Sequence, residues 1–134
     1  MTIAIGDIWA ASGILIGLQG HMFTTRVTRE ATRTDDRRIT HLPWSDVLNL
    51  TAVSVLVGGV FLVPTLVNVG SSFVRHAFSL AVLLYAGHAI ALAGHYNLYN
   101  SSKEFVSNHP TLQEKIIVGF VLLAAIAYVL LSVF

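Results

Sequence analysis

The stretch VLNLTAVSVLVGGVFLVPTLVNVGSSFV, residues 47–74, carries no charged side chain and decides the fold class. Three other stretches are equally free of Asp, Glu, Lys and Arg: residues 8–25, 76–102 and 116–134. A helix needs about 20 apolar residues to cross the hydrocarbon core of a bilayer, and each stretch holds one candidate. None of them alternates as a barrel strand does, and backbone in lipid otherwise has to be helical. The sequence therefore predicts an all-α integral membrane protein, a bundle of four transmembrane helices.

The composition leads to the same class. Hydrophobic residues make up 54% of the 134 residues and charged residues 11%, whereas soluble domains carry roughly 25% charged residues. The net charge of +1 gives no indication of nucleic-acid binding. The absence of cysteine excludes disulfides, thiolate metal sites and thiol catalysis. No basic segment precedes the first span, so a cleaved signal peptide is not expected.

The helix ends carry recognisable signals. The helices are predicted over residues 3–23, 45–67, 73–96 and 112–134, in a single transmembrane domain of residues 1–134 with polar loops over 24–44 and 97–111. Ser45 follows Pro43 and is a candidate N-cap, while Thr111 and Glu114 have the spacing of a capping box. Pro64, late in the second helix, predicts a kink or an early end.

The positive charges are distributed asymmetrically between the two ends of the spans. The first long connection contains five arginines: Arg26, Arg29, Arg33, Arg37 and Arg38. The last connection contributes Lys103 and Lys115, whereas the opposite side has only Arg75. By the positive-inside rule, both long loops face the cytoplasm and both termini lie outside, in an inner or plasma membrane. Trp9 and Trp44, near span ends, fit the aromatic belts.

Small residues form a stripe along the first helix. Its members follow one another at steps of four, three, four and three residues: Gly6, Ala10, Gly13, Gly17 and Gly20. This spacing places all five on one helix face, and small residues let helix backbones approach closely in lipid. We expect the stripe to pack within the same bundle; the alternative is self-association between subunits.

The third helix contains a local repeat, Ala86-Gly87-His88 followed by Ala93-Gly94-His95. Seven residues are nearly two turns, so the two histidines share one face about 10 Å apart. Gly87 and Gly94 are predicted helix-packing positions. A hydrogen bond from each imidazole to a neighbouring helix is the favoured interpretation, although ionisable groups within a span are also functional candidates. His88 is expected near the membrane centre.

Two histidines on different helices are candidates for holding a cofactor. In the expected orientation, His21 and His95 lie at the same depth near the cytoplasmic side, where an imidazole pair could ligate haem iron. The second and fourth helices contain no histidine, so no second haem is predicted. Asp7 lies toward the opposite membrane face, and no other metal site is predicted.

Basic and aromatic residues gather at the predicted cytoplasmic interface. Arg26, Arg29 and Arg33 recur at helical spacing if the first helix continues beyond the lipid, and Tyr96 ends the third helix. Contact with anionic lipid headgroups is the favoured interpretation. The alternative is a pocket for an anionic ligand built from the arginines and Tyr96.

The layout of four spans with both termini outside and a basic first cytoplasmic loop resembles the MAPEG family of membrane glutathione transferases over nearly the whole chain. This resemblance implies a trimer with a glutathione site at the cytoplasmic interface. The family's Arg, Asn, Glu and Pro follow in close order, whereas here Arg37 and Arg38 lead into HLPWSDVLN, residues 41–49. The third helix also lacks the family's arginines, so the resemblance is one of topology, which by itself does not carry function.

The sequence offers almost no mass outside the membrane, a glycine stripe and no convincing catalytic set. We therefore expect a non-enzymatic membrane component that acts by assembly, either as a homo-oligomer or as a small subunit of a membrane complex. A haem-binding subunit using His21 and His95 is one alternative. A transferase or ligand-binding protein with a site at the cytoplasmic interface is the other.

Overall fold

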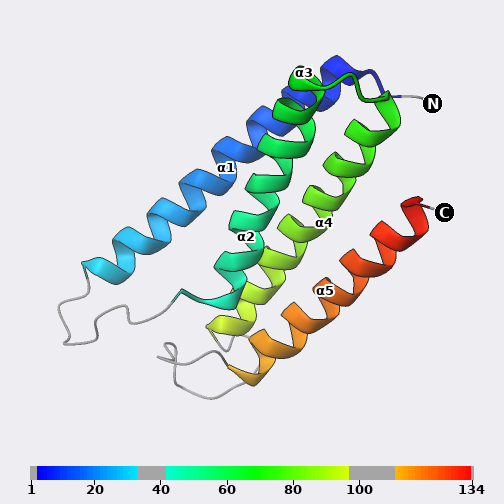
Figure 1. The fold of residues 1–134 in the computed structure, drawn as a ribbon. Helices are drawn as coiled ribbons and strands as arrows, with labels where there is room; N and C mark the ends of the chain where they lie inside the picture. Colours follow the sequence, from blue (N-terminus) through cyan, green and yellow to red (C-terminus); the bar gives the residue numbers. More distant parts are fainter. Residues whose placement is uncertain (1–2, 33–41, 97–110, 134) are drawn as a thin grey trace.

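The computed structural model describes residues 3–32, 42–96 and 111–133, and every element in these ranges is a helix. In chain order (Figure 1) the elements are α1 Ile5–Ala31, α2 Trp44–Val55, the π-helix η1 Leu56–Leu62, α3 Val63–Leu66, α4 Ser71–His95 and α5 Leu112–Val133. The helical prediction is confirmed. The predicted bound of the first helix at residue 23 is wrong: α1 continues to Ala31, into the predicted loop over 24–44, and includes Arg26.

Three helical segments of the described chain are long and apolar enough to cross a membrane. They are Trp44–Leu66, which joins α2, η1 and α3, then Ser71–His95 and Leu112–Ser132. These segments mark the chain as a membrane protein. α1 is not among them, although it has 27 residues, because Asp7, Gln19 and His21 lower its hydropathy. The predicted membrane helices are thus confirmed for three of four, and a fourth crossing stays a prediction.

The second span changes its helical pitch before Pro64. Proline has no N–H to give to the carbonyl of Val60, and its ring crowds that carbonyl. In η1 the chain adopts the wider π turn, and the N–H of Val63 reaches the carbonyl of Gly58 five residues back. The helix then ends at Leu66. Pro64 therefore acts as predicted on the helix end, and the irregularity takes the form of a π-helix.

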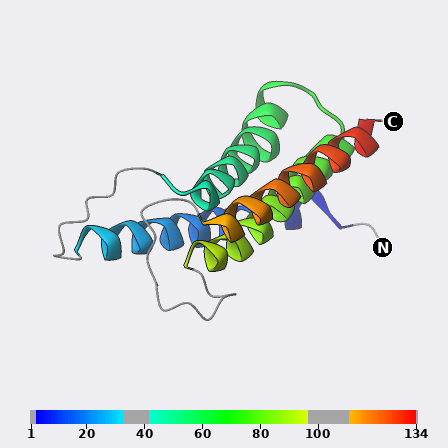
Figure 2. The ribbon, with the colours of Figure 1, turned by 90° about the horizontal axis from the view of Figure 1, so that it is seen from below.

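α4 is the central helix and packs against α1, α2, η1 and α5. Figure 1 shows α1 and α5 on opposite sides of α2 and α4, and Figure 2 gives the same bundle seen from below. One apolar cluster joins α2, α4 and α5: Leu48, Ala52, Leu84, Ala91, Val118 and Ala125. A second joins α1, η1 and α4: Ile8, Leu56, Val60, Val74 and Ala81. The two clusters bind α1 and α5 to separate parts of the bundle.

α1 has two unlike faces. Its inward face carries Ile8, Ser12, Gln19 and Arg26, which are all buried. Three of these four residues are polar and stand seven residues apart, which is nearly two turns and keeps them on one side of the helix. The five small residues of the predicted stripe are all exposed on the other side, and we call them the glycine face.

Candidate functional site

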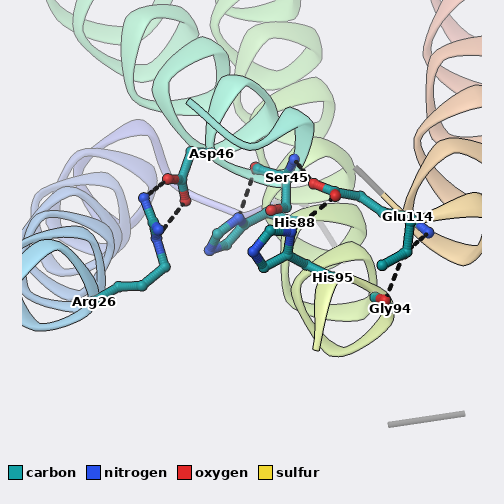
Figure 3. A network of polar contacts seen from close by, with 8 residues as sticks. Arg26, Ser45, Asp46, His88, Gly94, His95 and Glu114 are labelled. Carbon is teal, nitrogen blue, oxygen red and sulfur yellow. Dashed lines mark hydrogen bonds and ion pairs between the residues drawn. The ribbon is translucent and has the colours of Figure 1, made fainter. Parts of the chain in front are cut away.

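Ion pairs and hydrogen bonds connect all four long helices at one end of the bundle (Figure 3). Six residues form what we call the ionic network: Arg26, Ser45, Asp46, His88, His95 and Glu114. They come from the end of α1, the start of α2, the last two turns of α4 and the start of α5. None has more than 7% of its surface exposed. The network therefore lies inside the bundle and not on its surface.

Glu114 is the carboxylate that joins three helix ends. Its Oε1 accepts a hydrogen bond of 2.9 Å from the backbone N–H of Ser45, and its Oε2 accepts one of 2.9 Å from Nδ1 of His95. The N–H of Ser45 is one of the donors that the first turn of a helix leaves unpaired. A carboxylate is also stabilised by the partial positive charge at a helix N-terminus. Glu114 thus caps α2 from a different helix.

The predicted capping signal is found at the start of α5 but not at the start of α2. The hydroxyl of Thr111 accepts a hydrogen bond of 3.1 Å from the N–H of Glu114, as the capping-box spacing predicts. The side chain of Glu114 does not turn back onto its own helix start, because it is bound to Ser45 and His95. Ser45 is not the N-cap of α2: Pro43 holds that position, and Ser45 lies within the first turn.

His88 links α4 to α2. Its Nδ1 donates a hydrogen bond of 2.8 Å to the carbonyl oxygen of Ser45, which can only accept, so this nitrogen carries the proton. Its ring also stacks on Tyr85 with centroids 6.4 Å apart. Because Ser45 is the second residue of α2, His88 lies level with the start of the second span. The expectation that His88 lies near the membrane centre stays a prediction.

Arg26 and Asp46 form the buried ion pair that attaches α1 to α2. Nε of Arg26 lies 3.1 Å from Oδ1 of Asp46, and a second guanidinium nitrogen bonds to Oδ2. Such a two-pronged contact matches the planar fork of arginine. Asp46 has no exposed surface. One partner without the other would leave a charge buried without compensation, so the pair has to be kept or lost together.

The structure brings some of the predicted site residues together and separates others. Arg26, His88 and His95 all belong to the ionic network, and the ring of Tyr96 meets that of His95 edge-on at 5.2 Å. His21 instead lies on the exposed side of α1, away from buried His95. The side chain of Arg29 lies outside the described residues, as do Arg33, Arg37, Arg38 and Lys103. Within one chain, the structure does not pair the two histidines predicted to hold haem.

Sequence reasoning missed the two carboxylates of the network. Asp46 and Glu114 each stand in the first turn of a span. From the sequence alone, Glu114 is assigned only to a capping box, and Asp46 is given no role. Their partners are 20 and 69 residues away in the chain, so local spacing gives no indication of the contacts. The seven-residue spacing of Ser12, Gln19 and Arg26 was the available signal for the buried face of α1.

The glycines of α1 and those of α4 have opposite surroundings. A Cβ added to Gly87 would lie 2.5 Å from the methyl groups of Val121, and one added to Gly94 would lie 3.0 Å from Ile117. These two glycines let α5 approach α4 closely. On α1, a Cβ added to Gly6, Gly13, Gly17 or Gly20 would meet nothing within 4 Å in the described chain. The expectation that the stripe packs within this bundle is therefore wrong.

Comparisons with protein-family models, with curated protein sequences and with solved structures found no match to this chain. The functional argument consequently rests on the two features described above, the ionic network and the glycine face.

Proposed function

We propose that this protein acts by assembly in the membrane, with the glycine face of α1 as its contact surface and a second copy of the chain as its partner. The observation that carries this proposal is the lack of any contact over Gly6, Gly13, Gly17 and Gly20 in the described chain. In lipid, helix association depends on close packing, and small residues permit it. The Gly13–Gly17 spacing is the dimer motif of such interfaces.

The contrast with α5 supports this assignment. The outward face of α5 consists of large apolar side chains of the kind that face lipid: Leu112, Ile116, Phe120, Leu122, Leu123, Ile126, Val129, Leu130 and Leu131. The exposed surface of α1 carries a stripe of small residues beside the large apolar Trp9, Ile14 and Leu18, and the polar side chain of His21 is exposed next to that stripe. A polar group facing hydrocarbon is costly unless it finds a partner. The face of α1 therefore suits a protein neighbour better than it suits lipid.

A fourth crossing by α1 is part of this proposal. Alone, α1 lacks the hydropathy of a membrane span. Its polar inward residues are buried against the bundle, and a partner on the glycine face would cover the weakly apolar outward side. A two-fold axis along the membrane normal would bring two copies of α1 together in parallel, and two-fold symmetry is the commonest in oligomers.

The ionic network supports a structural role in this assembly. Its carboxylates are bound by Arg26, His95 and the N–H of Ser45, and its side chains are almost fully buried. Such a network fixes the positions of α1, α2, α4 and α5 relative to one another at one end. It thereby presents the glycine face in a fixed orientation to the partner.

Disulfide cross-linking tests the proposal, because the chain has no cysteine of its own. Gly13→Cys and Gly17→Cys are produced separately and oxidised in native membranes, with Leu123→Cys on the exposed side of α5 as the matched control. We expect covalent dimers of the two α1 variants and none of the control. Dimers of all three variants alike, or of none, would contradict an interface on α1. A cross-link to a different protein would mean that the partner on the glycine face is another subunit and not a second copy of this chain.

A further inference from the structure

Five buried polar atoms on α1 and α2 have no hydrogen-bond partner within the described part of the chain. They are Oγ of Ser12, Nε2 and Oε1 of Gln19, Oγ of Ser45 and Oδ1 of Asn49. Each of the four residues has at most 1% of its surface exposed. Native proteins pair most of their buried polar side-chain atoms, so a group of unpaired ones requires an explanation.

Three of these residues lie next to one another. Nδ2 of Asn49 donates a hydrogen bond of 3.3 Å to the backbone carbonyl of Gln19, which brings α2 against α1 at this level. Ser45 precedes Asn49 by one turn, so their Cβ atoms are about 5–6 Å apart. We call Gln19, Ser45 and Asn49 the amide site. The amide site shares Ser45 with the ionic network, because the backbone carbonyl of Ser45 is the acceptor for His88.

Other hydroxyls of the second span are satisfied by their own helix. Oγ1 of Thr51 donates to the carbonyl of Val47 over 2.7 Å, and Oγ of Ser54 donates to that of Leu50 over 2.8 Å. Ser45 is in the first turn of α2 and has no preceding helical turn to bond. The Gln19 side chain has neither its donor nor its acceptor paired. The amide site therefore holds unpaired donors and acceptors on α1 and α2 where the bond between Asn49 and the backbone of Gln19 joins the two helices.

We propose that the amide site binds internal water molecules between α1 and α2. Gln19 offers two N–H donors and one acceptor, Asn49 an acceptor, and Ser45 a hydroxyl that can do both. Buried water typically makes about three hydrogen bonds to otherwise unpaired polar groups, which these atoms supply. None of the unpaired atoms is charged, and the nearest ionic groups, Arg26 and Asp46, are bound to each other. A small neutral ligand fits this chemistry, whereas an ion does not.

The hydrated region ends inside the bundle. Ser12 lies two turns beyond Gln19 on the same face of α1, about 10 Å further along the axis. Next to it is the apolar cluster that contains Ile8, Leu56 and Val60, all of which are buried. Water at the amide site is thus closed off on this side, and the polar atoms form a site and not a continuous path through one chain.

Water-edited solid-state NMR of the protein in lipid bilayers tests the proposal. Magnetisation transferred from water should reach the side-chain amides of Gln19 and Asn49, and it should not reach the methyl group of Ala52, which is fully buried among apolar residues. The control variant Ser54→Ala removes a self-bonded hydroxyl outside the site and should leave this transfer unchanged. Transfer to both amides no greater than to Ala52 would overturn the proposal.

A stability measurement gives an independent answer. If water pairs the Gln19 amide, Gln19→Met removes those hydrogen bonds, and Tm should fall by several degrees. If the amide were unpaired in a dry interior, the same substitution would remove the cost of burying it, and Tm would rise. A rise in Tm of Gln19→Met therefore contradicts the water site. Neither result depends on whether α1 mediates assembly, because Gln19 lies on the opposite side of α1 from the glycine face.

Discussion

The carboxylate of Glu114 accepts a hydrogen bond from the backbone N–H of Ser45 over 2.9 Å, although the two residues are 69 positions apart in the chain. The same carboxylate holds Nδ1 of His95. One side chain at the start of α5 thus satisfies the start of α2 and the end of α4. In a membrane protein this matters, because a buried N–H without a partner in a span costs several kcal/mol, roughly as much as a core cavity.

Substitution of Glu114 should lower the free energy of unfolding in a graded way. Glu114→Ala leaves the N–H of Ser45 and the Nδ1 proton of His95 without acceptors, and we expect a loss of about 3–5 kcal/mol. Glu114→Gln retains a neutral acceptor for one of them and should lose about 1–3 kcal/mol. Unfolding by SDS in mixed micelles measures both values. Equal stability of the two variants and the unchanged protein would mean that the carboxylate does not cap α2.

The ion pair between Arg26 and Asp46 should behave as a coupled unit. Either Arg26→Met or Asp46→Leu alone leaves a buried charge uncompensated and should cost about 3–5 kcal/mol of unfolding free energy. The double variant removes both charges and should be much closer to the unchanged protein, since apolar replacements of buried ion pairs are often nearly neutral. A double-mutant cycle in the same micelles checks this. Additive losses would show that the two side chains act independently.

Glycines of α4 and α1 should respond differently to the same substitution. Gly87→Ala places a Cβ 2.5 Å from Val121, and we expect an overpacking loss of about 1–3 kcal/mol in unfolding free energy. Val121→Ala in the same chain should recover part of that loss. Gly20→Ala meets no atom within 4 Å in the described chain, and its higher helix propensity should stabilise the monomer by about 0.5–1 kcal/mol. Equal losses at both positions would refute the assigned packing.

Labelling of single cysteines from outside the cell tests whether α1 crosses the membrane. Ala4 and Ser71 should be on one side, and Thr32 and Leu112 on the other; all four are exposed in the structure. An impermeant maleimide should therefore label Ala4→Cys and Ser71→Cys in intact cells, and Thr32→Cys and Leu112→Cys only after lysis. Labelling of Thr32→Cys in intact cells together with Ala4→Cys would mean that α1 does not cross.

The sequence predicts helices well because lipid imposes strict demands on them. Charge-free runs have to be helical where water cannot satisfy the backbone, so α4 and α5 agree with their predicted bounds to within a few residues. The effect of Pro64 on its helix can be predicted from the sequence alone, because proline lacks the N–H that would bond to the carbonyl one turn earlier. The packing of α1 is harder to predict from the sequence. Its glycine spacing identifies a face but does not say whether that face meets its own bundle or another chain.

The candidate site was predictable only in part, because its contacts join residues distant in the chain. The paired spacing of His88 and His95 correctly indicated hydrogen bonds to neighbouring helices, and α2 and α5 supply the acceptors. The identity of those acceptors, Ser45 and Glu114, depends on the relative heights of three helices. Those positions along the bundle follow from side-chain packing, such as the close approach of α5 to α4 at Gly94, which no single segment of the sequence determines.

The central claim, assembly through the glycine face, is tested most directly by native mass spectrometry of the protein in lipid nanodiscs. The unchanged chain should appear as a multiple of 14.5 kDa. The variant Gly13→Leu/Gly17→Leu should appear at the mass of a single chain while retaining its helical circular dichroism, because a Cβ at either position meets no atom within 4 Å in the described part of the chain. An unchanged chain at 14.5 kDa with no partner, or an oligomer that survives both substitutions, would contradict the account.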